Sequence, residues 1–193
     1  MARLLLAVLF FVLICQFSAR DPDNRIMDAC LIIFIIAGVT DWLDGYLARR
    51  NNQVTTLGRV LDPFVDKVLI CGAFVFFAGA DFVDASDRNI TAVAPWMVVV
   101  IIARELLVTA LRGLSESGGQ SFGADVFGKI KTIIQMVTAG LIMLLVAHGR
   151  LDDPQSVTTI LARVMLWITI AITVCSGLNY VYKARNLLFA RSE

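Results

Sequence analysis

Six apolar runs divide this sequence, and short polar segments separate them. A helix needs roughly 20 apolar residues to cross a hydrocarbon core of about 30 Å, so such runs leave few folds open other than a bundle of membrane helices. Hydrophobic residues make up 58% of the chain, whereas soluble domains contain about 45–50%. We therefore predict an all-α integral membrane protein, with six transmembrane helices in one bundle and a single domain over residues 1–193. The predicted spans are residues 4–17, 27–40, 61–79, 95–111, 127–147 and 160–182.

The first apolar run, residues 4–17, has two interpretations. Its length and position are typical of the core of a signal peptide. No small-x-small cleavage pattern follows it, however, and Arg20, Asp21 and Asp23 come next. We interpret the run as a retained first span.

Positive charge is distributed unevenly between the two ends of the predicted spans. Six spans place both termini on one side, where 12 Lys and Arg residues fall, against 5 on the other side. Cytoplasmic loops carry the excess of Lys and Arg, so we predict that the first side is cytoplasmic, in an inner or cell membrane of bacterial type. The net charge of +1 gives no indication of nucleic-acid binding.

Four aspartates lie where the second and third runs approach the predicted cytoplasmic surface. The first two are three residues apart and the second two are four apart, so each pair can share one face of a helix. We expect the second helix to continue through the first pair as far as Arg49. The four residues are Asp41, Asp44, Asp62 and Asp66.

This acidic cluster needs positive charge to stabilise it. An aspartate at the middle of a spanning helix costs about 2.5–3.5 kcal/mol on an insertion scale. A hard divalent cation with oxygen ligands is the simplest partner. One or two such ions could neutralise a phosphate and stabilise charge during phosphoryl transfer. The sequence therefore predicts a polar metal site on the cytoplasmic side of the bundle.

Small residues and an arginine share the two acidic faces. Gly45, Ala48 and Gly58 could admit a bulky ligand close to the backbone, or could serve only for helix packing. Arg49 continues the first acidic face, where it could bind phosphate or anchor the helix among lipid headgroups.

The spacing of these residues resembles the signature of the CDP-alcohol phosphotransferase family, with no mismatch. That signature reads Asp41-x-x-Asp44-Gly45-x-x-Ala48-Arg49, then eight residues, then Gly58-x-x-x-Asp62-x-x-x-Asp66. The resemblance implies a six-helix membrane enzyme, usually a homodimer, that transfers a phosphatidyl or related group from a CDP-linked donor to an alcohol and releases CMP.

The same resemblance implies roles for single residues. Asp41, Asp44 and Asp62 would ligate Mg²⁺ or Mn²⁺, and Asp66 would lie near the metals as the general base for the acceptor hydroxyl. The CDP site would be formed by Asp41, Gly45, Ala48, Arg49 and Gly58.

A second group of charged residues lies in the fourth and fifth runs. Arg104 is costly within a span unless it faces a polar cavity or pairs with Glu105. Arg112 ends the fourth run, and Lys129 and Lys131 begin the fifth on the same side. These cations could converge on an acceptor that carries a phosphate, or could anchor the helices at the membrane surface. We take Arg104, Arg112, Lys129 and Lys131 as candidates for binding the acceptor phosphate.

The segments AREL, ALR and GKIKT around these cations resemble the phosphatidylglycerophosphate synthases within the family. That branch implies CDP-diacylglycerol as donor and sn-glycerol 3-phosphate as acceptor, among membrane lipids. One feature departs from the pattern, because relatives carry an Asn and a Thr just before an Arg in the first span. Only Arg3 can match that Arg here, so we expect that this sequence is truncated or starts late, and the resemblance does not carry over the donor-headgroup contacts from this end.

Other functions stay open at this point. Within the family, the acceptor could be an inositol phosphate, serine or a second phospholipid. An intramembrane prenyltransferase also binds Mg²⁺-diphosphate through aspartates, but with other spacings. A divalent-cation transporter would need acidic residues at mid-membrane in several spans. Outside the motif the predicted spans are nearly free of acidic residues, with Glu105 as the exception.

The cysteines and the histidine offer no further site. The four cysteines, at positions 15, 30, 71 and 175, lie in apolar runs without CxxC spacing, so we predict buried thiols. His148 is the single histidine. A catalytic triad or a zinc site would need more partners, so we predict a loop residue there.

Overall fold

The computed structural model describes residues 2–51, 56–117, 126–148 and 156–189. Within these ranges the side chains at 2, 41–51, 56–63, 66, 115–117, 126–127 and 186–189 fall outside the described part. Two polar segments between the predicted spans, residues 152–155 and most of residues 51–56, also lie outside the described residues.

The described part of the chain is helical and forms no extended strands, so the all-α prediction is confirmed. Most helices exceed the predicted apolar runs, because charged and polar residues extend them beyond the apolar part. Pro95 begins its helix as expected, since the first helical position needs no N–H donor. The helices are α1 (Ala2–Ile14), α2 (Asn24–Asn51), α3 (Thr56–Phe77), α4 (Pro95–Ser117), α5 (Val126–Ala147) and α6 (Val157–Phe189), with a short 3-10 helix η1 (Ala80–Phe82) after α3.

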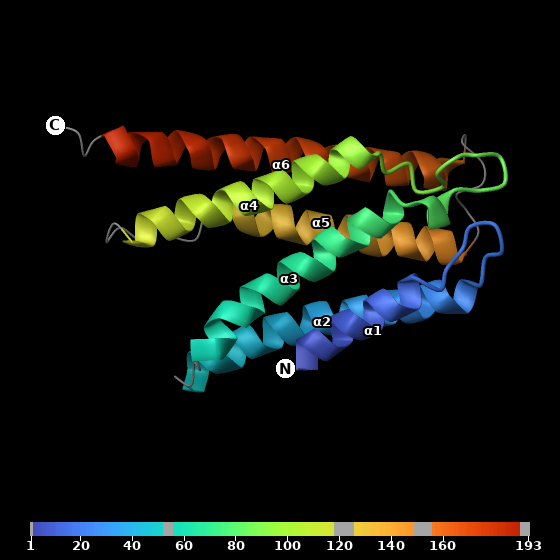
Figure 1. Cartoon of the computed structure of the whole chain (residues 1–193), viewed down its shortest axis with the longest axis horizontal. Coiled ribbons are helices and arrows are strands. Elements are labelled where there is room, and N and C mark those ends of the chain that lie inside the picture. The colour runs from blue at the N-terminus through green and yellow to red at the C-terminus, as the bar shows by residue number, and fades with distance from the viewer. Residues whose placement is uncertain (1, 52–55, 118–125, 149–155, 190–193) are drawn as a thin grey trace.

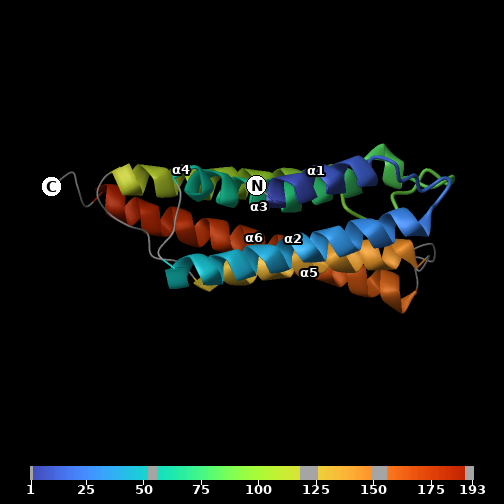
Figure 2. The same ribbon diagram turned by 90° about the horizontal axis from the view of Figure 1, so that it is seen from below.

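The long helices run side by side in two layers (Figures 1 and 2). One layer contains α1, α3 and α4, and the other contains α2, α5 and α6. Between the layers, α1 packs on α2, α3 on α5, and α4 on α6. Because α3 contacts α1, α2, α4 and α5, it links the N-terminal helices to the C-terminal ones.

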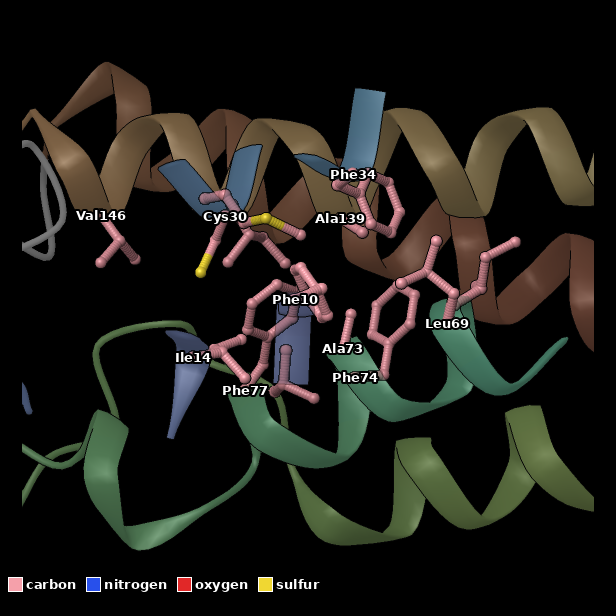
Figure 3. Close-up of a cluster of buried hydrophobic side chains, with 14 of the residues drawn as sticks. Phe10, Ile14, Cys30, Phe34, Leu69, Ala73, Phe74, Phe77, Ala139 and Val146 are labelled. Carbon is pink, nitrogen blue, oxygen red and sulfur yellow. The ribbon is translucent and has the colours of Figure 1, made fainter. Parts of the chain in front are cut away.

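The core lies where α1, α2, α3 and α5 meet (Figure 3). Phe10 of α1 is fully buried and packs against Phe34 of α2, with ring centroids 5.8 Å apart. Phe74 and Phe77 of α3 fill the opposite side of the cluster. Close van der Waals contacts between these side chains stabilise the packing of the four helices.

The segment between α3 and α4 closes the end of α3. Asn89 Nδ2 and Thr91 Oγ1 each donate a hydrogen bond of 2.8 Å to the carbonyl oxygen of Phe77. Phe82 of η1 is buried against Phe17, with ring centroids 5.0 Å apart. The carbonyl of Phe77, which has no partner within α3 because the helix ends there, is therefore hydrogen-bonded by the side chains of Asn89 and Thr91.

Two stretches of the described helices are long and apolar enough to cross a membrane, Gly128–Ala147 and Val157–Arg185. Shorter apolar stretches, Arg3–Ile14 and Lys67–Phe77, lie in α1 and α3.

The prediction of buried cysteines is wrong for two of the four positions. Cys30 is buried and Cys71 is partly buried, whereas Cys15 and Cys175 are exposed on the surface of the bundle. An apolar run supplies both the inner and the outer face of a membrane helix, so its composition does not say which face a cysteine occupies.

Candidate functional site

The acidic motif lies on two consecutive helices that pack against each other. Its first half, Asp41 to Arg49, belongs to α2, and its second half, Gly58 to Asp66, belongs to α3. The backbone is helical throughout both halves, so the spacings of three and four residues keep each acidic pair on one helix face. The side chains of the eight motif residues lie outside the described part.

The adjoining ends of α2 and α3 lie at one end of the molecule (Figure 1). The C-terminal half of α4 and the start of α5 lie toward the same end. The fold therefore brings the acidic motif and the cation-bearing segments to the same end of the bundle.

Lys67 gives a direct contact between these two regions. It follows Asp66 in the chain, and its ammonium donates a hydrogen bond to Thr109 Oγ1 on α4. Thr109 in turn donates to the carbonyl oxygen of Glu105, one turn earlier on α4, at 2.7 Å. The end of the acidic motif is thus held against the part of α4 that carries Arg104 and Arg112.

A buried cluster of charges joins α4 to α5. The Glu105 carboxylate accepts a hydrogen bond from Arg104 Nη1 at 3.0 Å and another from the Lys131 ammonium. The exposed fractions of the three residues are only 8% for Arg104, 7% for Glu105 and 4% for Lys131. Pairing of Arg104 with Glu105 was one of the two arrangements open from the sequence, and it is confirmed. One carboxylate between two cations leaves a net positive charge inside the bundle.

Arg104 also reaches α6. Its Nη2 donates to Ser176 Oγ at 2.6 Å, and its guanidinium carbon lies 5.6 Å from the centre of the Tyr180 ring. A Cβ on Gly177 would come within 3.2 Å of Arg104 Cγ, so the glycine makes room for this side chain. Arg104 Nε is buried without a hydrogen-bond partner among the described residues.

Arg112 and Lys129 differ from the two buried cations because both are exposed. Arg112 Nη2 donates a hydrogen bond of 3.3 Å to the hydroxyl of Tyr180. The four candidate cations therefore form two groups, with Arg104 and Lys131 committed to Glu105 and the other two accessible at the surface.

The partners Ser176 and Tyr180 were not predicted from the sequence. They lie four residues apart and so share one face of α6. This spacing could indicate a polar contact between helices only if the facing polar residues on α4 were already known. Nearby polar pairs continue between α5 and α6, with Gln135 donating to Thr173 at 3.2 Å. Polar residues on apolar helices thus mark the buried contacts between α4, α5 and α6.

An apolar groove of about 730 Å³ lies between α2 and α5. Gly38 and Val39 form its wall on α2, two or three residues before Asp41. Met136 and Gly140 form part of the opposite wall on α5. The groove therefore runs along the apolar part of the helix whose next turn carries the acidic motif.

The sequence of this chain matches a known protein family over most of its length. The family model for CDP-alcohol phosphatidyltransferases matches residues 1–175. The chain belongs to the CDP-alcohol phosphatidyltransferase family. The resemblance seen in the acidic motif is thereby confirmed, and the chain is a member of a family of membrane enzymes.

Several CDP-alcohol phosphatidyltransferases with curated names resemble this chain over most of its length. A Bacillus subtilis protein is 38% identical over 152 residues, covering 79% of this chain and 71% of the relative. A Sodalis glossinidius protein is 40% identical over 162 residues, covering 83% and 80%. A Rickettsia bellii protein is 29% identical over 178 residues, covering 92% and 89%. All three are named CDP-diacylglycerol–glycerol-3-phosphate 3-phosphatidyltransferase.

Proposed function

We propose that this protein transfers the phosphatidyl group of CDP-diacylglycerol to sn-glycerol 3-phosphate, giving phosphatidylglycerol phosphate and CMP. The observation that carries the proposal is the complete acidic signature on two packed helices, in a chain whose relatives are named for this reaction.

The donor set on α2 and α3 suits a divalent metal. Four carboxylates at helical spacing supply only hard oxygen ligands, which Mg²⁺ and Mn²⁺ prefer. Asp41, Asp44 and Asp62 would hold the metal, with Asp66 beside it. A metal held by these residues would supply positive charge to the diphosphate of the donor and to the leaving CMP.

The chain itself has to bind the nucleotide and its lipid. Gly45, Ala48 and Gly58 would let the CDP group approach the backbone of α2 and α3, and Arg49 would pair with phosphate. The apolar groove between α2 and α5 suits acyl chains, because its lining is almost entirely apolar and it begins within one turn of Asp41.

The reaction then needs an activated acceptor hydroxyl. Asp66 would take the proton from that hydroxyl as its oxygen bonds to the phosphorus that carries diacylglycerol. The bond from this phosphorus to the bridging oxygen breaks, and CMP leaves with its own phosphate. The hydrogen bond from Lys67 to Thr109 supports this role, because it holds the segment after Asp66 against α4.

The phosphate of the acceptor needs cations near Asp66. Arg112 and Lys129 are accessible at the end of the bundle that carries the motif, so they are the better candidates for direct contact. Arg104 and Lys131 would not contact the phosphate but would attract it from within the bundle, through the net positive charge of their cluster with Glu105.

The membrane arrangement belongs to the same proposal. Six helices would cross the bilayer, with the acidic end facing the cytoplasm where the excess of Lys and Arg lies. The family resemblance extends the proposal to a homodimer, which cross-linking in native membranes can test.

Release of CMP from CDP-diacylglycerol tests the proposal. CMP should appear only when sn-glycerol 3-phosphate is added, and Asp66→Asn should abolish it, whereas Asp81→Asn, at an exposed position of the 3-10 helix, should not. Release that proceeds faster with serine, an inositol phosphate or a phospholipid would move the protein to another acceptor class. If no alcohol led to release of CMP, the proposal that the protein is a CDP-alcohol phosphatidyltransferase enzyme would be contradicted.

A further inference from the structure

We propose that Tyr180 is a positioning residue that orients Arg112 toward the phosphate of the acceptor. The inference rests on the proposed function and deepens it, because it assigns part of the preference for a phosphorylated alcohol to a residue outside the acidic signature.

Tyr180 lies where three helix segments meet. It belongs to α6, and only 2% of it is exposed. Its hydroxyl accepts a hydrogen bond of 3.3 Å from Arg112 Nη2 on α4. A Cβ added to Gly128 at the start of α5 would lie 3.5 Å from the same hydroxyl oxygen. The hydroxyl therefore lies between the two segments that carry the accessible cations, since Lys129 follows Gly128 directly.

The Tyr180 ring is held in place from its other side. The guanidinium of Arg104 lies 5.6 Å from the ring centre, within the range of a cation–π contact. Arg104 is itself fixed by Glu105 at 3.0 Å and by Ser176 at 2.6 Å. Turning the ring would disturb a buried and paired cation, so the position of the hydroxyl is defined by the packing beneath it.

The hydrogen bond to Tyr180 should help the exposed Arg112 to bind phosphate. Its long side chain has many rotamers, and binding costs less entropy when one contact already restricts them. One guanidinium nitrogen of Arg112 bonds to the buried hydroxyl. The remaining N–H groups of a planar guanidinium can still form a two-pronged contact with a phosphate.

The consequence is specific because the phenol is neutral. Replacing Tyr180 by Phe leaves every formal charge unchanged and keeps the ring against Arg104. The substitution removes the hydrogen bond that orients Arg112, so binding of the phosphorylated acceptor should weaken while binding of the lipid donor on α2 and α3 should not.

Steady-state kinetics of the full-length protein in mixed micelles tests the inference. Tyr180→Phe should raise KM for sn-glycerol 3-phosphate about three- to tenfold, which is the effect of one ordinary hydrogen bond. The KM for CDP-diacylglycerol and kcat should stay near the wild-type values. Tyr182→Phe is the matched control, because this tyrosine lies two residues further along α6 and is 65% exposed.

A double-mutant cycle with Arg112→Gln separates positioning from packing. In the Arg112→Gln background, Tyr180→Phe should change KM for the acceptor by less than about twofold. Effects that multiply instead, an unchanged KM in Tyr180→Phe, or an equal rise in both KM values would each overturn the role of Tyr180. Absence of turnover with sn-glycerol 3-phosphate in the wild type would contradict the proposed function itself, and the inference would fall with it.

Discussion

Lys131 on α5 donates a hydrogen bond to the carboxylate of Glu105 on α4, and both side chains are buried within the bundle. Arg104 shares the same carboxylate. Pairing with this carboxylate explains why Arg104 and Lys131 can be buried between mostly apolar helices. It also predicts where the bundle is most sensitive to loss of a charge.

Glu105→Gln should destabilise the protein strongly. The substitution leaves Arg104 and Lys131 buried without their shared anion, and breaking a buried ion pair from one side costs about 3–5 kcal/mol. Thermal unfolding in detergent should show a clear loss of stability. Arg88→Gln is the control, because its contact with Asp84 lies near the surface and such pairs contribute about 0–1 kcal/mol. Equal stability of Glu105→Gln and wild type would mean that the cluster contributes nothing to the fold.

Two glycines should respond differently to alanine. A Cβ on Gly72 would lie 2.4 Å from the ring of Phe11, which is rigid, whereas one on Gly38 would meet only the terminal methyl of Met136, which can move. Gly72→Ala should therefore cost about 1–3 kcal/mol by overpacking, and Gly38→Ala should cost less. Unfolding of the two variants in the same detergent compares them, and the reverse order would contradict this account of the α1–α3 contact.

Gly45→Leu should block binding of the lipid donor while leaving the fold intact. The leucine side chain would occupy the acidic face of α2, where the CDP group is proposed to approach the backbone. Binding of CDP-diacylglycerol and thermal unfolding should be measured on the same preparation. Normal donor affinity in a folded variant would show that Gly45 serves only for helix packing.

Removal of divalent metal should stop the reaction. Without the metal the four carboxylates repel one another, and nothing offsets the negative charge of the donor diphosphate, so the donor site is lost. Turnover should disappear in excess chelator and return with Mg²⁺ or Mn²⁺. Full activity in excess chelator would refute the role assigned to the aspartates.

Much of the fold could be predicted from the sequence, because apolar length alone sets the helices. The six helices lie where the apolar runs predicted them, and Pro95 begins α4. The extension of α6 to Phe189 was not predicted, since polar residues continue the helix after the apolar run ends.

The contacts between helices could not be predicted in the same way. Rotation of each helix about its axis decides which polar residues meet, and an apolar run does not fix that rotation. Ser176 and Tyr180 therefore became visible as partners of Arg104 and Arg112 only in the structure. The same reason explains the wrong prediction for Cys15 and Cys175.

The most direct test of the central claim follows labelled sn-glycerol 3-phosphate into lipid. The purified protein, CDP-diacylglycerol and Mg²⁺ should give labelled phosphatidylglycerol phosphate with an equal amount of CMP, even in the presence of excess serine or inositol phosphate. Label that stays in the aqueous phase while CMP is released with another alcohol would contradict the account.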